Sequence, residues 1–424
     1  MKDIETRWPN RLLALATRHR HFRLPHLDLA SAPGGGTRAG QEEAKPDIKK
    51  RIGSAAFAFR GYDVANIGRT NELLAHPAYG PVVSKALDTA SALCADATHK
   101  HVDLVEQVRS QRDSTLETFP EDVALIVAME VTQVRLLEQF FEIPAHDAKL
   151  SFGYSIGELS SMVYGGVFEL EQLLPIPLGL AQDCAELAAD TTMGILFTRG
   201  PALPPPDVHR LCMAISSEGR GLIGPSAFLS PNTALVLGQG DSLDRLERAM
   251  GDFLPDKVML RRNPNKWPPL HTPLVWQRNI PNRTAMAVYS IQGGHHKPTP
   301  AVYSCVTGSP SYDEYNSREL LTKWTDHPQR LWDVIYDTLA SGVELVIHVG
   351  PQPNLIPATF SRLSNNVGKQ LGGKYLQMLG RSVYSSVNRH AWLAHLLPQK
   401  AALLRAPFLE HVILEDWLLE QEVA

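Results

Sequence analysis

The spacing of hydrophobic positions divides the chain into helical and strand-like segments. Apolar residues recur at helical spacing over 81–98, 102–112 and 119–141, which predicts three amphipathic helices. Short apolar runs that end in turn residues predict buried strands at 54–59 and 343–350. Strands and helices that alternate in this way indicate an α/β fold.

Residues 191–265 follow a different pattern and predict a small inserted domain. Strand-like runs alternate with helical segments over 193–197, 206–219, 234–238 and 242–250. This order is typical of a ferredoxin-like split βαβ unit. Beyond it, we expect a β-rich region over 285–306 and a helical stretch over 316–340, which return to the main sheet.

The two ends of the chain read as extensions of this core. Residues 1–50 contain a stretch rich in Gly, Pro and Ala, which favours a flexible linker. Residues 376–424 are mostly helical in pattern and end in an amphipathic helix over 408–420. The predicted main domain therefore comprises residues 51–190 and 266–375.

Composition and charge exclude several classes of protein. The 424 residues include 41 Lys+Arg and 45 Asp+Glu, a formal net charge of −4, so no basic footprint for nucleic acid is present. No run approaches the length of about 18 apolar residues that a membrane span requires. The four cysteines lie far apart, without metal-ligand spacing, so we expect reduced thiols and a cytoplasmic protein.

The sequence GYSIG at residues 153–157 is the candidate for catalytic chemistry. A G-x-S-x-G pattern between a strand and a helix is typical of a nucleophile elbow, whose tight turn needs both glycines. Ser155 would be exposed at the positive end of the following helix. The N–H of Ile156 would point at a developing oxyanion.

Sequence proximity alone does not choose the base for Ser155 among 16 histidines. His271 lies in a proline-bounded loop, where polar side chains often face a cleft. His348 lies within an apolar run and is better explained as a strand residue. The exposed pair His295 and His296 is not a convincing metal site, so we expect neither a metal nor a bound cofactor.

Together, these segments resemble the malonyl-CoA:acyl-carrier-protein transacylases and the acyltransferase domains of polyketide synthases, over about residues 54–375. The family's opening Phe-x-Phe-Pro-Gly-Gln-Gly corresponds to FAFRGYD at 57–63, and its Gly-His-Ser-x-Gly-Glu to GYSIGE at 153–158. Its second segment, Phe-His-Ser-Pro-x-Met, corresponds to LHTPLV at 270–275, and its Val-Gly-Pro-Gly to VGPQ at 349–352.

The resemblance implies an α/β-hydrolase-like main domain with an inserted ferredoxin-like subdomain. It implies that Ser155 attacks the thioester of an acyl-CoA, with His271 as its base. The oxyanion would be held by the N–H groups of Tyr62 and Ile156. The acyl group would then pass to the phosphopantetheine thiol of an acyl carrier protein.

Departures from the family pattern bear on the choice of acyl group. The arginine with which family members bind malonate corresponds to Leu180, and a polar glutamine corresponds to Trp324. A buried carboxylate without a cation is strongly disfavoured. We therefore expect an uncharged acyl group, in a pocket formed by Tyr154, Leu180, Trp324 and Leu270.

Four alternatives remain open from the sequence. The first is an acyl-carrier-protein hydrolase, and the second is a malonyl transferase that uses a relocated cation such as Arg199. A third is an inactive docking module. The fourth is an ordinary α/β-hydrolase with Asp207 as the acid and His348 as the base.

Overall fold

The computed structural model describes residues 47–371 and 391–423, all within one unit, Glu42–Ala424. The strands are β1 (Ala55–Phe59), β2 (Leu150–Gly153), β3 (Thr191–Thr198), β4 (Ile223–Ser230), β5 (Thr233–Gln239), β6 (Val258–Asn263), β7 (Ala301–Tyr303), β8 (Leu345–Val349) and β9 (Glu410–Ile413). The α-helices are α1 (Ile48–Arg51), α2 (Thr70–Ala75), α3 (Gly80–Thr98), α4 (Leu104–Arg109), α5 (Phe119–Phe141), α6 (Ile156–Tyr164), α7 (Leu170–Leu173), α8 (Pro175–Ala189), α9 (Pro205–Ser216), α10 (Ser242–Phe253), α11 (Ile280–Ser290), α12 (Ser317–Lys323), α13 (Leu331–Ala340), α14 (Leu355–Leu371), α15 (Ala391–Leu396) and α16 (Leu414–Leu419). Short 3₁₀ helices are η1 (Ile52–Ser54), η2 (Ala145–Asp147), η3 (Pro273–Arg278) and η5 (Ala401–Phe408).

Parallel strands form the main sheet, in the order β7-β2-β1-β8-β9. Every residue of β1 and β8 is buried, as expected for strands that are covered on both faces. Because parallel strands end at the same edge of a sheet, the loops after β1, β2 and β8 meet there. The strands predicted at 54–59 and 343–350 and the α/β fold class are confirmed.

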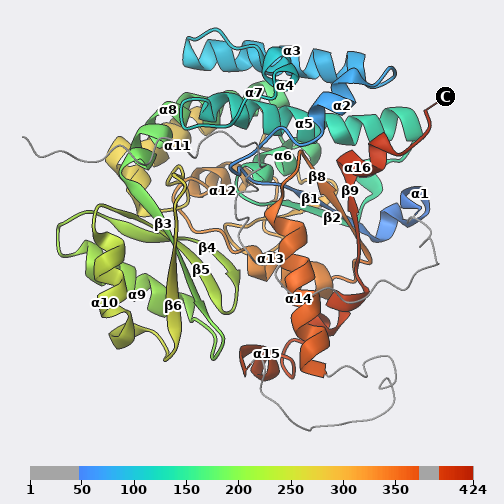
Figure 1. Cartoon of the computed structure of the whole chain (residues 1–424). Helices are drawn as coiled ribbons and strands as arrows, with labels where there is room; N and C mark the ends of the chain where they lie inside the picture. The colour runs from blue at the N-terminus through green and yellow to red at the C-terminus, as the bar shows by residue number, and fades with distance from the viewer. Residues whose placement is uncertain (1–46, 372–390, 424) are drawn as a thin grey trace, which may run out of the picture. The chain divides into compact units, whose positions relative to one another are not determined.

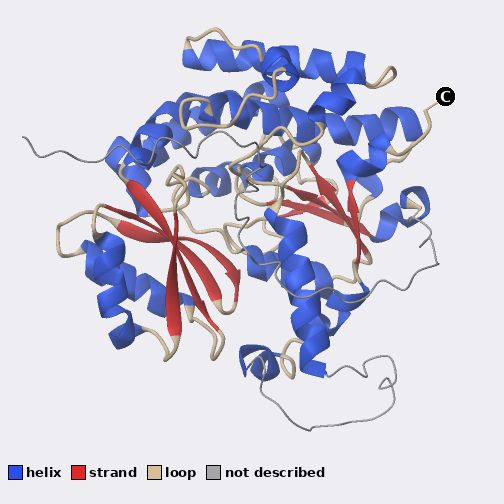
Figure 2. Cartoon of the chain, viewed as in Figure 1, coloured by secondary structure: helices blue, strands red, loops and turns tan. Residues whose placement is uncertain are grey.

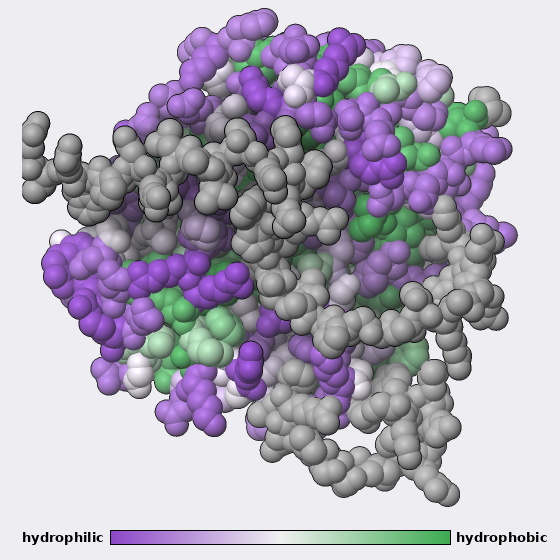
Figure 3. All heavy atoms as spheres, in the orientation of Figure 1, coloured by the Kyte–Doolittle hydropathy of each residue, from purple (hydrophilic) through white to green (hydrophobic). Residues whose placement is uncertain are grey.

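The second sheet is antiparallel and has the order β4-β5-β3-β6 (Figure 2). Helix α9 connects β3 to β4, and α10 connects β5 to β6, so the predicted ferredoxin-like subdomain is confirmed. Leu243 and Leu246 are buried on the inner face of α10, whereas the outer face of this helix is strongly hydrophilic (Figure 3). The sequence pattern does not indicate β4 or β6.

Helices cover both faces of the main sheet. Helices α5 and α6 lie on one face and α13 and α14 on the other (Figure 1). The predicted helix at 119–141 is α5, which packs against α3, α6 and α8. Along α5, the side chains of Asp122, Glu130 and Gln133 are buried together with its apolar residues. Glu130 accepts a hydrogen bond from Ser160 in α6, and Gln133 accepts the N–H of Gly350 after β8.

Two expectations from the sequence are wrong. The β-rich region expected over 285–306 begins with the end of helix α11, and β7 is its only named strand. The helix expected over 408–420 is instead β9 followed by α16, and β9 pairs in parallel with β8. The predicted linker within residues 1–46 and the segment 372–390 lie outside the described residues.

Candidate active site

Ser155 lies in the tight turn between β2 and α6. Its backbone has φ 56° and ψ −119°, a conformation that residues other than glycine rarely adopt. A Cβ atom on Gly153 would lie 2.0 Å from the carbonyl carbon of Gly157, and one on Gly157 would lie 2.3 Å from the carbonyl oxygen of Arg60. Both positions therefore require glycine, and the turn presents Ser155 at the positive end of α6.

His271 is the histidine that the fold brings to Ser155. The Ser155 Oγ lies 2.8 Å from Nε2 of His271, and Nδ1 of His271 lies 2.6 Å from the main-chain oxygen of Trp324. A carbonyl oxygen only accepts hydrogen bonds, so Nδ1 carries the hydrogen and Nε2 is left as the acceptor for the serine hydroxyl. This is the tautomer that a general base needs.

The surroundings of His271 keep its imidazole neutral. Burial lowers the pKa of His271 to about 4, and the carbonyl of Trp324 and the carboxylate of Asp326 oppose this shift only in part. The backbone of His271 has φ 64°, and its N–H donates to the carbonyl of Thr325 at 2.7 Å. At neutral pH, the ring can therefore accept a proton from Ser155.

Two further contacts at the Ser155–His271 pair come from residues near the end of α12. The indole Nε1 of Trp324 donates to the carbonyl oxygen of Ser155 at 2.8 Å. The side chain of Gln329 is fully buried, and its Oε1 accepts the N–H of Ser155 at 3.1 Å. Sequence reasoning missed Gln329, because no motif includes it and only its position after Pro328 marks a break in the helical pattern.

The predicted oxyanion residues lie at the start of α6 and in the loop after β1. Ile156 is the first residue of α6, so its N–H has no acceptor within the helix. Tyr62 lies in the loop after β1, where its ring packs edge-on against Phe119 at 4.9 Å and Trp267 at 6.0 Å between ring centroids. The roles of the two N–H groups stay a prediction.

The loop that carries Tyr62 folds around the fully buried guanidinium group of Arg60. Arg60 donates to the carbonyl oxygens of Gly61 and Pro351, at 2.8 and 2.5 Å, and to Oδ1 of Asn66 at 2.7 Å. This arrangement joins the loop after β1 to the loop after β8. Arg60 stands where the motif that this segment resembles has proline.

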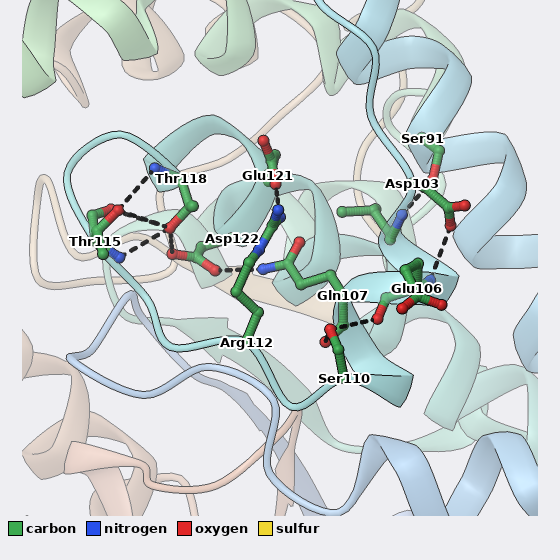
Figure 4. A network of polar contacts seen from close by, with 11 residues as sticks. Ser91, Asp103, Glu106, Gln107, Ser110, Arg112, Thr115, Thr118, Glu121 and Asp122 are labelled. Carbon is green, nitrogen blue, oxygen red and sulfur yellow. Dashed lines mark hydrogen bonds and ion pairs between the residues drawn. The ribbon is translucent and has the colours of Figure 1, made fainter.

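Figure 4 shows a network of polar contacts at the start of α5, and the same loop makes a hydrogen bond next to this network. The side chain of Asn66 donates to Oγ of Ser114 at 3.0 Å, just before this helix. Within the network, Gln107 Nε2 donates to Asp122 Oδ1 at 2.9 Å, and Thr118 Oγ1 donates to Asp122 Oδ2 at 3.2 Å. Burial raises the pKa of Asp122 to about 7, so the network contains a carboxyl group that titrates near neutrality.

The residues predicted to form the acyl pocket are largely buried around one hydrophobic cluster. Leu180 and Trp324 belong to it, and Leu270 packs against it. The ring of Trp324 stands edge-on to His271, with 5.2 Å between the ring centroids. Tyr154 lies directly over Gly61, where a Cβ atom would approach its ring to 2.7 Å. Contact of these side chains with an acyl group stays a prediction.

Glu158 fixes α6 one turn beyond Ser155. Its buried carboxyl group accepts hydrogen bonds from Ser304 Oγ at 2.6 Å, Tyr312 Oη at 2.8 Å and the N–H of Cys305 at 3.2 Å. Burial raises the pKa of Glu158 to about 7 in spite of these bonds. The helix that carries the nucleophile is thus tied to the segment after β7.

The fold keeps the alternative acid and base apart from Ser155. His348 lies in β8, where its Nε2 is 3.0 Å from Nδ1 of His411 in β9. Asp207 lies in α9 and pairs with Arg210. Within the described residues, no cluster of three metal-binding side chains is found, and none of the helices is long and apolar enough to span a membrane.

Solved structures resemble the fold of this chain, although no family model and no curated protein match its sequence. FabD from Acinetobacter baumannii is 17% identical with a TM-score of 0.58, and the match covers 73% of this chain and 90% of that one. An acyl carrier protein S-malonyltransferase from Vibrio cholerae is 19% identical with a TM-score of 0.56, covering 73% and 94%. A third structure, the malonyl-transacylase PlMCAT in complex with the type II PKS acyl-carrier protein AntF, is 18% identical with a TM-score of 0.52, covering 72% and 91%. The chain has the fold of these transacylases.

Proposed function

We propose that this chain is a divergent member of the malonyl-CoA:acyl-carrier-protein transacylase family and moves an acyl group from coenzyme A to an acyl carrier protein through Ser155. One observation carries the proposal: Ser155 Oγ lies 2.8 Å from Nε2 of His271, whose Nδ1–H is held by the Trp324 carbonyl. This nucleophile and base lie on a transacylase fold, at an elbow that two glycines make possible.

In the first half of the reaction, Ser155 takes the acyl group from the thioester. Nε2 of His271 accepts the hydroxyl proton while Oγ bonds to the carbonyl carbon, and the carbonyl π electrons move to oxygen. The N–H groups of Tyr62 and Ile156 stabilise this oxyanion. When the carbonyl re-forms, the C–S bond breaks, and the coenzyme A sulfur takes the proton from Nε2. The products are free coenzyme A and an ester on Ser155.

In the second half, the pantetheine thiol of the carrier protein replaces coenzyme A. It gives its proton to Nε2 of His271, and its sulfur attacks the ester carbon. The C–O bond to Ser155 then breaks, and the serine oxygen recovers the proton from Nε2. The chain returns to its starting state with no metal and no oxidation or reduction.

The surroundings of α8 support an uncharged acyl group. Leu180 is buried at the position of the family's carboxylate-binding arginine. Two arginines beside α8 are engaged by its acidic residues: Arg278 binds Glu186 at 2.9 Å and Arg283 binds Asp183. Arg199, the other candidate cation, is exposed at the end of β3. None of these three arginines is therefore both buried and free of a carboxylate partner, as a cation that binds a buried malonyl carboxylate would need to be.

The test is a transfer assay with a panel of acyl-CoAs and a holo acyl carrier protein. We expect acetyl or longer uncharged groups to transfer faster than malonyl. We expect Ser155→Ala to abolish transfer and His271→Ala to slow it by roughly 10²–10⁴-fold, as for loss of a general base. If the assay releases the free carboxylic acid and does not form the acyl thioester of the carrier protein, the chain is a hydrolase. Full activity of Ser155→Ala would contradict the proposal.

A further inference from the structure

Gln329 contacts both the small antiparallel sheet and the Ser155–His271 pair. Its main chain binds β4, and its side chain contacts Ser155 and His271. Its main-chain N–H donates to the carbonyl of Ser226, and its carbonyl accepts the N–H of Phe228, both at 2.8 Å. These bonds pair residue 329 with Ala227 in β4, at a point where the pairing of β4 with β5 is irregular. The backbone of Gln329 is therefore fixed by the subdomain and not by α12 or α13.

The same stretch of β4 also holds the segment that carries His271. Ser226 Oγ donates to the carbonyl of Leu270 at 3.4 Å. A Cβ atom on Gly224 would lie 2.4 Å from the ring of Pro273, so the two segments are in close contact. One strand of the subdomain thus contacts the residues on both sides of His271 as well as Gln329.

The orientation of the Gln329 amide follows from its neighbours. The N–H of Ser155 needs an acceptor, so Oε1 faces Ser155 at 3.1 Å and Nε2 faces Nδ1 of His271 at 3.3 Å. Because Nδ1–H already donates to the Trp324 carbonyl, two N–H groups meet at this contact. The positive end of the amide dipole therefore lies against the imidazole and disfavours a positive charge on it.

We propose that Gln329 is a positioning residue for acyl transfer, which holds the strained backbone of Ser155, keeps His271 unprotonated and links both to strand β4. The inference rests on the proposed function and deepens it. Apart from Gln329, the hydroxyl of Ser155 and the carbonyl and ring of Trp324 contact the imidazole of His271, and the charged group that acts on the ring is Asp326. The Asp326 carboxylate is itself bound by Trp276 Nε1 at 2.9 Å and by His327 Nδ1 at 2.6 Å.

Two substitutions separate the two parts of this role. Gln329→Met keeps the size of the side chain and removes the acceptor for the Ser155 N–H. Gln329→Glu keeps an acceptor there and replaces the amide N–H₂ with an oxygen that faces Nδ1. The matched control is Gln133→Met, because Gln133 is also fully buried and its Oε1 accepts a main-chain N–H, that of Gly350, at 2.7 Å.

The experiment measures the rate of Ser155 acylation by acetyl-CoA from pH 4 to 8, on full-length variants whose folding is verified by circular dichroism. Gln329→Met should be acylated about tenfold more slowly than Gln133→Met, the effect of one buried donor left without an acceptor. Gln329→Glu should move the midpoint of the acidic limb to higher pH by about one unit, because a nearby carboxylate favours the imidazolium.

The outcomes separate this inference from the proposed function. Equal acylation rates for Gln329→Met and Gln133→Met would overturn the positioning of Ser155 by Gln329. An unchanged acidic midpoint in Gln329→Glu would overturn its action on His271. If the wild-type chain forms no ester with any acyl-CoA or acyl carrier protein, the proposed function fails first, and that result is seen without any variant.

Discussion

Both glycines of the nucleophile elbow are required because a Cβ atom at either position would collide with main-chain atoms. Gly157 lies against the main chain at the end of β1, where a Cβ atom would approach the carbonyl oxygens of Arg60 and Phe59 to 2.3 and 2.5 Å. Backbone atoms cannot move aside as a flexible side chain can. The close contact at Gly157 therefore fixes the start of α6 against β1. Because Ser155 precedes this helix, the same contact fixes the backbone of Ser155.

We expect Gly157→Ala to lower the free energy of unfolding by more than about 2 kcal/mol, through forced separation of α6 and β1. The control is Gly179→Ala in α8, where a Cβ atom would meet nothing within 4 Å. At this exposed helical position, alanine should stabilise by about 0.5–1 kcal/mol. Chemical denaturation of both variants measures the difference. Equal stabilities would show that the elbow is not tightly packed.

The residue at position 180 should decide whether a carboxylated acyl group is accepted. Leu180→Arg would place a guanidinium group where the family's malonyl-binding arginine stands, so the ratio of malonyl to acetyl transfer should rise by at least about tenfold. Leu180→Met, which adds no charge, should leave the ratio unchanged. If the ratio for Leu180→Arg also stays at the wild-type value, Leu180 does not line the acyl pocket.

At this scale, a motif can point to particular residues. The resemblance of the segments around Ser155 and His271 to two family motifs predicts their pairing, and in the structure their side chains lie 2.8 Å apart; their catalytic roles stay a prediction. The contacts of Trp324 and Gln329 cannot be derived in the same way. They arise from a short segment between α12 and α13 that lies against the elbow only in the folded chain.

Helix α6 depends on a buried carboxyl group that favours its protonated form. Because the folded pKa of Glu158, about 7, lies above the ordinary value of 4.5, the stability it contributes is present at low pH and is lost as the pH rises through 7. Glu158→Gln should remove this dependence. Its melting temperature should fall less between pH 6 and 8 than that of the wild type, by about 1–2 °C. If the melting temperatures of the wild type and of Glu158→Gln fall equally between pH 6 and 8, groups other than Glu158 cause the pH dependence.

Among the elements, a helix with a regular apolar repeat is predictable, whereas strands β4, β6 and β9 are not, although β4 is buried over most of its length. Helix α5 is predicted over its whole length because its apolar positions repeat for 23 residues. Strand β6 contains Arg261 and Arg262, and as an edge strand it does not need an apolar pattern. Strand β9 has four residues, and its sequence also fits a helix. Only its pairing with β8 defines it as a strand.

For the whole molecule, two sets of buried groups give opposite dependences of stability on pH. Burial raises the pKa values of four carboxyl groups to about 7 or 8, so their contribution is lost as the pH rises through that range: Asp122, Glu130, Glu158 and Glu415. Burial lowers the pKa values of four histidines below the ordinary 6.5, so their contribution is lost as the pH falls through the lowered values: His209, His271, His348 and His411.

Because the two effects oppose each other between about pH 4.5 and 6.5, the melting temperature should be nearly constant there. It should fall from about pH 6.5 to 8, where only the carboxyl groups still titrate, and level off above pH 8; it should also fall just below pH 4.5. Calorimetric scans from pH 4 to 9 measure this profile. A melting temperature that rises steadily from pH 6 to 9 would show that exposed charges, and not these buried groups, determine the dependence.

The central claim is that Ser155 carries the acyl group, and intact-protein mass spectrometry tests it most directly. The chain is mixed briefly with acetyl-, butyryl-, octanoyl- and malonyl-CoA, and the modified residue is located by peptide mapping, with Ser155→Ala as the control. The account predicts one added acyl group on Ser155 from an uncharged donor, little or none from malonyl-CoA, and none on the variant. An acyl group on another residue, or one retained by Ser155→Ala, would contradict it.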